Sequence, residues 1–169
     1  MNIVNVAWKL IAKVCAQPVV AEWLIRRAKK TPYVHIYGKG GEMYMGRWWL
    51  FNPYPYPEEK RENWFPISIR IHHIKRKDDD RELHDHPWNA RTIILKGGYR
   101  EIRLNERGYE EWHIRHPGDT AKLKYGEFHR ITYVPPEGAY TIFITGKYRG
   151  TWGFLVDGVK VQWRQYLGQ

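Results

Sequence analysis

The sequence predicts an all-β protein of one domain, an antiparallel β-barrel or jelly roll preceded by two N-terminal α-helices. First, short β-type runs follow one another from residue 66 onward, separated by turn residues and with no helical pattern between them. Second, ten prolines and fifteen glycines in 169 residues favour many short elements over a helical bundle. Third, a hydrophobic fraction of 43%, with 15% aromatic residues, suffices for a packed core and excludes a disordered chain.

The first 32 residues are predicted to form a helical segment that packs on the β-barrel of residues 33–169. Residues 3–15 form an amphipathic helix, since Ile3, Leu10 and Val14 share one face and the lysines lie on another. A second helix begins at Pro18 and ends before Pro32. The residues of this helix that we expect to face the barrel are Val19, Val20, Trp23 and Leu24. Contact with a membrane surface, or phosphate binding, is the alternative role of the segment.

Ten runs after these helices are predicted strands. They are Met43–Phe51, Pro66–Lys75, Thr92–Lys96, Gly98–Leu104, Glu110–Arg115, Ala121–Lys124, His129–Val134, Tyr140–Thr145, Thr151–Val156 and Val159–Arg164. Asp157-Gly158 between two alternating apolar runs predicts a hairpin. The segment Lys75–Glu82 mixes charges of both signs and is predicted to be a solvated loop.

Charge and cysteine content narrow the function classes. The net charge is +10, and half of this excess lies in the first thirty residues, which contain six basic residues and one acidic residue. Such a balance favours an anionic partner, although no nucleic-acid motif is present and nucleic acid is the less favoured partner. The single cysteine excludes an internal disulfide framework and fits a cytoplasmic protein. The sequence contains no run of 18 uncharged apolar residues, so we predict no transmembrane segment.

Three histidines carry the strongest chemical signal. His84 and His86 flank one residue, and His129 follows 43 positions after the second of them. In a strand, side chains two residues apart point to the same face, with Cα atoms about 6.5 Å apart. Two such imidazoles can bind one metal ion, and a third from a facing strand completes a set with open coordination positions. The predicted cofactor is a divalent transition metal: iron, manganese, nickel or zinc.

The spacing around these histidines resembles the two motifs of the cupin superfamily. His84 and His86 followed by Gly97-Gly98 match the later half of the first motif, whose opening glycine is replaced by Asp78. Gly118, Gly126 and His129 match the second motif, with Lys124 and Tyr133 where proline and asparagine are usual. The resemblance covers roughly residues 66–156. It implies a cupin-type antiparallel β-barrel with a metal held by His84, His86 and His129.

The glutamate of the first cupin motif is missing. Its place falls on Ala90 or on Arg91, depending on which glycine is counted, and neither is a metal ligand. The resemblance therefore implies a three-histidine site, similar to that of the thiol dioxygenases within the cupins. Arg91 would face inward only if its strand bulges near Pro87, and it would then hold an anionic substrate.

Other residues are predicted to complete the site. Tyr99 and Glu101 share a face of the next strand, where either serves as an acid/base group or as a partner of a metal ligand. Trp88, Tyr133 and Arg91 are the predicted substrate-binding residues. His72 and His73 lie on opposite faces of their strand, so one of them is expected to enter the barrel.

Two functions follow from these residues. The first is a metal-dependent, oxygenase-like or Lewis-acid cupin that acts on a small anionic substrate. The alternative is a binding module without metal chemistry, which holds a nucleotide or similar small molecule on its aromatic rings. Segments such as Leu83–Trp88 and Gly150–Gly158 also resemble small cupin-like proteins of bacteriophages and prophages. That setting implies the cytoplasm of a host cell, and exposed strand edges are compatible with a homodimer.

Overall fold

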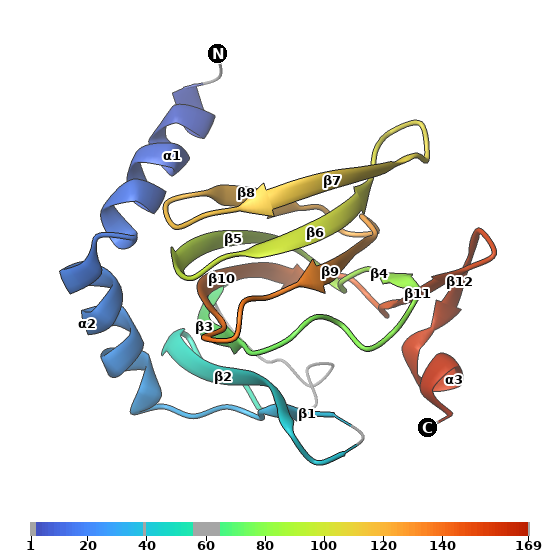
Figure 1. The fold of residues 1–169 in the computed structure, drawn as a ribbon, viewed down its shortest axis with the longest axis horizontal. Coiled ribbons are helices and arrows are strands. Elements are labelled where there is room, and N and C mark those ends of the chain that lie inside the picture. The colour runs from blue at the N-terminus through green and yellow to red at the C-terminus, as the bar shows by residue number, and fades with distance from the viewer. Residues whose placement is uncertain (1–2, 39, 56–64, 169) are drawn as a thin grey trace.

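The computed structural model describes residues 3–38, 40–55 and 65–168 and contains two antiparallel sheets of six strands each (Figure 1). In order across the first sheet, the strands are β1 (Ile36–Tyr37), β2 (Met43–Phe51), β3 (Ser68–Ile74), β10 (Ala139–Tyr148), β5 (Trp88–Lys96) and β8 (Thr120–Leu123). Across the second they are β12 (Val159–Gln162), β11 (Gly153–Val156), β4 (Leu83–His84), β9 (His129–Tyr133), β6 (Tyr99–Leu104) and β7 (Glu110–Arg115). This arrangement confirms the predicted all-β, cupin-type fold.

Both predicted helices are present, as α1 (Ile3–Cys15) and α2 (Pro18–Lys29). They lie along one side of the barrel, opposite the short C-terminal helix α3 (Trp163–Leu167), as Figure 1 shows. Their buried residues join one hydrophobic cluster with the outer face of the first sheet: Ala12, Ala21, Ile25, Ala28, Ile71, Ile93, Leu95 and Ile142. The helices therefore cover one face of this sheet and leave the barrel interior to other residues.

The face that α2 turns to the sheet differs from the prediction. Ala21, Ile25 and Ala28 are buried, whereas Val19 is 82% and Trp23 is 57% exposed. Alanines allow the helix backbone to approach the sheet closely, so the contact selects the face with small side chains. The expectation that Val19 and Trp23 face the barrel was wrong.

The strand predictions hold well where turns are sharply marked. The hairpin at Asp157-Gly158 joins β11 to β12 with Val156 paired to Val159, and both turn residues have positive φ, as a tight hairpin requires. The predicted strand Val159–Arg164 ends earlier than expected, at Gln162, and the residues after it form α3.

Strand alternation divides the residues of the first sheet between its two faces. On β5, Ile93 and Leu95 pack beneath the helices, whereas Ala90 and Ile94 belong to interior clusters between the sheets. The interior is not completely filled, because a cavity of about 430 Å³ is lined by both sheets. This cavity contains the candidate site.

Candidate metal centre

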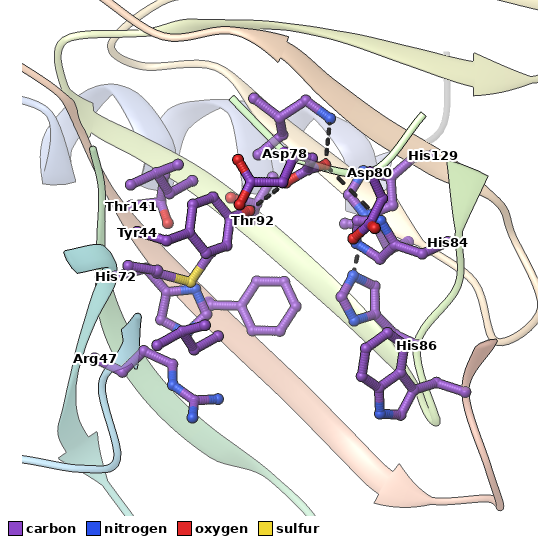
Figure 2. Close-up of a pocket in the computed structure, with 18 of the residues that line it drawn as sticks. Tyr44, Arg47, His72, Asp78, Asp80, His84, His86, Thr92, His129 and Thr141 are labelled. Atoms are coloured by element: carbon purple, nitrogen blue, oxygen red, sulfur yellow. Dashed lines mark hydrogen bonds and ion pairs between the residues drawn. The ribbon is translucent and has the colours of Figure 1, made fainter. Parts of the chain in front are cut away.

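The three predicted histidines meet at the cavity. His84 on β4 and His129 on β9 are directly paired across the second sheet, and His86 follows β4. One nitrogen from each ring lies within 4.8 Å of the others. The Nε2 atoms of His86 and His129 are 3.0 Å apart. Figure 2 shows the three side chains converging from one side of the pocket.

The convergence has a different cause from the one predicted. β4 ends at His84, so His86 is not part of a strand but lies where the chain passes from β4 in the second sheet to β5 in the first. Asp85 anchors this crossing: it is fully buried, accepts the Gly153 N–H at 2.8 Å and pairs with Lys160 at 2.5 Å. The anchored crossing turns His86 towards His129.

A buried carboxylate holds the ring of His129. The Nδ1 atom of His129 lies 3.3 Å from Glu101, which also pairs with Arg115 at 2.6 Å and with Arg103 at 3.0 Å. Burial alone would raise the pKa of Glu101, but the hydrogen bond with His129 and the two arginines keep this pKa below its usual range. Glu101 is therefore an anion that orients His129. It does not line the cavity, and this position argues against the predicted alternative of an acid/base group at the substrate.

A second carboxylate stands behind His84. Asp78 lies 3.8 Å from the Nδ1 atom of His84. Its oxygens accept the Ile131 N–H at 2.7 Å and the Tyr44 hydroxyl. The side chain is only 8% exposed, so the prediction that Lys75–Glu82 is simply a solvated loop was wrong at this residue. The one sequence signal for this role was that Asp78 replaces the opening glycine of the cupin motif.

The donor set fits a transition metal. Burial is the main cause that lowers the pKa of His84, to about 4, and the pKa of His86 well below its ordinary value. Both rings are therefore neutral near pH 7, which is the form that binds metals. With Nδ1 of His84 facing Asp78 and Nδ1 of His129 facing Glu101, the Nε2 atoms point inward. Two nitrogens about 2.1 Å from one ion at a right angle are about 3.0 Å apart, the separation seen between His86 and His129.

The wall of the first sheet faces these rings with polar groups. His72 on β3 pairs in register with Arg47 on β2 and Thr141 on β10, and Thr92 on β5 pairs with Phe143 of β10 (Figure 2). His72 is buried and stacks on Phe143, and its Nε2 atom has no hydrogen-bond partner among the described residues. The prediction that one residue of the His72–His73 pair enters the barrel is thus confirmed for His72.

Two predicted substrate-binding residues lie elsewhere. Arg91 points away from the cavity, with its guanidinium 4.6 Å from the centre of the Trp8 ring of α1 and bonded to Thr120. Its strand does not bulge at this point. The regular alternation of side chains along the strand therefore directs Arg91 to the outer face of the sheet. Tyr133 is 46% exposed and carries Arg100 over its ring. The structure therefore places neither predicted substrate-binding residue at the cavity where the three histidines meet.

Trp88 and Tyr99, by contrast, line the cavity. Trp88 is buried and its ring is nearly parallel to that of His86. Tyr99 is also buried, and burial together with the Glu101 charge raises the pKa of its hydroxyl. Tyr99 is therefore a neutral hydrogen-bonding group near pH 7 in the cavity wall. Sequence reasoning did not assign a role to Arg47, Arg70, Thr92 or Thr141, which carry no motif.

Comparisons with known proteins identify the fold. No family model matches the chain, and no curated protein matches it either. Among solved structures, the chain is similar to a cupin-2 domain, Rru_A2000 from Rhodospirillum rubrum, with 12% identity, a TM-score of 0.53 and coverage of 73% of this chain and 74% of that one. It is also matched to oxalate decarboxylase from Bacillus subtilis at 19% identity and a TM-score of 0.45. That match covers 62% of this chain and only 26% of the decarboxylase.

The class defined by fold and site is thus a cupin-type barrel with a three-histidine group suited to a metal. The likeness to the cupin-2 domain supports the barrel alone. The chemistry rests on the side chains of this chain.

Proposed function

We propose that the protein binds one divalent transition metal through His84, His86 and His129 and acts on a small anionic molecule in the adjoining cavity. The observation that supports the proposal is the meeting of one ring nitrogen from each of the three histidines within 4.8 Å, on segments 43 residues apart. Such a set would leave coordination positions for a ligand. A bound iron would supply oxygenation chemistry, and manganese, nickel or zinc would supply Lewis-acid chemistry.

The residues around the histidines have positioning roles in this proposal. Glu101 accepts a hydrogen bond from the Nδ1–H of His129, and Asp78 lies beside Nδ1 of His84, so each ring keeps its Nε2 atom directed to one point. Tyr99 offers a neutral hydroxyl to the ligand. Trp88 lies beside His86, with the two rings nearly parallel and their centres 6.3 Å apart.

The opposite wall supports an anionic substrate. Arg47 and Arg70 both line the cavity beside His72. Burial is the main cause that holds the pKa of His72 well below its ordinary value, and the positive charges of Arg70 and Arg47 lower this pKa further. A field that disfavours an added proton favours a carboxylate or a phosphate at the same place. We propose that the anionic group lies against Arg47 and His72 while the rest of the molecule reaches towards the three histidines.

Metal titration tests the proposal. Chelator-treated protein is titrated anaerobically with Fe(II) and with Mn(II), beside His84→Ala and His129→Ala. His113→Ala is the matched control, because His113 lies on β7 outside the cavity. We expect about one equivalent bound by the wild type and by the control, and under about a tenth of an equivalent by the other two. Equal binding by all four proteins would refute the proposal.

The anionic part is tested separately with malonate and inorganic phosphate as probes. We expect both to raise the melting temperature of the wild type, and Arg47→Met to weaken the probe's apparent affinity about tenfold without changing metal content. If the two probes raised the melting temperature of Arg47→Met as much as that of the wild type, the result would contradict the role of Arg47.

A metal-free binding module is the second candidate. It is favoured by the aromatic rings in the cavity wall: Tyr44, Trp88, Tyr99, Phe143, Trp152 and Phe154. Such rings can stack on a nucleotide base. Two results together would favour this function. Nucleotides would stabilise a His84→Ala/His129→Ala variant as they stabilise the wild type, and the wild type would bind no metal.

A further inference from the structure

The apolar face of α1 is exposed. Ile3, Leu10 and Val14 lie on it together with Ile11, and Leu10 and Val14 are each 60% exposed. At 100° per residue these side chains occupy one continuous arc. The helix packs on the barrel through its other side, where Ala12 is buried and Trp8 meets Arg91. A contiguous apolar stripe on a protein surface marks an interaction site.

Cations border the apolar residues on both helices. Lys9 and Lys13 lie beside the stripe of α1, between it and the buried face. On α2, exposed Val19 and Trp23 share their side of the helix with exposed basic residues, namely Arg26, Arg27 and Lys30. The first thirty residues carry six cations and one acidic residue, Glu22. Apolar side chains flanked by long basic ones are typical of helices that lie in a lipid headgroup region.

We infer that α1 and α2 attach the protein to an anionic membrane surface, with the stripe of α1 inserted among the headgroups. A second copy of the chain is the less favourable occupant, because a two-fold interface would bring the cations of one copy against those of the other. Nucleic acid would leave the apolar stripe in water. An anionic bilayer satisfies both features, since it offers apolar depth and negative charge together.

The helices would lie on the bilayer and would not cross it. α1 has 13 residues and α2 has 12, so each is roughly 20 Å long, against a hydrocarbon core of about 30 Å. In the described part of the chain, no single helix has the length and apolarity of a membrane span, and α1 and α2 reach that threshold only as a pair bent by 82°. Since α1 and α2 lie along one side of the barrel (Figure 1), attachment through them holds the metal centre away from the lipid.

Vesicle sedimentation of the full chain tests the inference. Phosphatidylcholine vesicles with about one third phosphatidylserine are compared with pure phosphatidylcholine vesicles. The variant Leu10→Gln/Val14→Gln removes two exposed apolar side chains, and Ile114→Gln/Val159→Gln removes two of similar exposure from β7 and β12 as a matched control. The variant Lys9→Gln/Lys13→Gln removes charge alone. Circular dichroism verifies that all remain folded.

We expect the wild type and the control to sediment with anionic vesicles and not with neutral ones. We expect the partition coefficient of Leu10→Gln/Val14→Gln onto anionic vesicles to fall at least about tenfold. The Lys9→Gln/Lys13→Gln variant is expected to lose the part of the binding that added salt weakens in the wild type. Absence of sedimentation with anionic vesicles, or an equal loss in the control, would overturn the inference. So would a wild-type dimer in light scattering that Leu10→Gln/Val14→Gln converts to a monomer, because the stripe would then be covered by a second copy.

Discussion

Replacement of Glu101 by glutamine tests how the site is held together. The Glu101 side chain is fully buried and touches three partners within 3.3 Å: His129, Arg103 and Arg115. Glutamine keeps the shape of the side chain but removes its charge. It also offers N–H groups where the partners need an acceptor. The change therefore disturbs His129 and leaves two arginines without their common counter-ion.

The structure sets the size of the effect. Loss of one partner from a buried ion pair costs about 3–5 kcal/mol. We expect the lower end, about 3 kcal/mol, because Arg103 keeps Glu127 at 2.9 Å and Arg115 is partly accessible to water. Loss of a group that orients a metal-binding histidine weakens metal affinity about 10–100-fold.

Two measurements separate these effects. Urea unfolding of the metal-free protein gives the stability change, and competition with a chelator gives the metal affinity. Glu127→Gln is the matched control, because Glu127 pairs with the same Arg103 but does not contact His129. We expect it to cost about 1 kcal/mol or less and to leave metal affinity unchanged. Metal affinity of Glu101→Gln equal to that of the control would refute the positioning role of Glu101.

Three further changes test other parts of the structure. Burial and the charges of Arg70 and Arg47 lower the pKa of His72 below 6.5, so below about pH 6.5 the unfolded chain binds a proton that the folded chain does not, and stability falls. His72→Gln should make this fall shallower by up to about 1.4 kcal/mol per pH unit in urea unfolding, and an identical slope would contradict the argument. Arg91→Met should leave metal and malonate binding within about twofold of the wild type, since Arg91 lies beneath α1, and calorimetric loss of either would show that it serves the site. Asp85→Asn should lower stability by about 1–3 kcal/mol, because it weakens the contacts with Lys160 and the Gly153 N–H, and an unchanged melting midpoint would be inconsistent with this anchor.

The barrel and the meeting of the three histidines could be predicted from the sequence because both have local signals. Turn residues such as Asp157-Gly158 mark strand ends directly. His129 and the glycines before it follow one another at a fixed spacing, which the closed barrel converts into a position facing His84. The predicted trio is therefore the same group that the structure brings together.

The rest depended on contacts between distant segments. Asp78 stands in a run of charged residues, and only its buried contacts with Tyr44 and the Ile131 N–H give it a role behind His84. Arg47 carries no motif and reaches the cavity because β2 pairs with β3. The face that α2 buries was likewise set by how closely a helix can approach the sheet, which favoured Ala21 and Ala28 over the larger Trp23.

Anomalous diffraction from crystals grown with Mn(II) or Fe(II) tests the central claim most directly. Data collected above and below the absorption edge of the metal locate any bound ion without reference to activity. The account predicts one strong peak about 2.0–2.3 Å from the Nε2 atoms of His84, His86 and His129. A map with no peak there, or with His129 turned away from the other two rings, would contradict it.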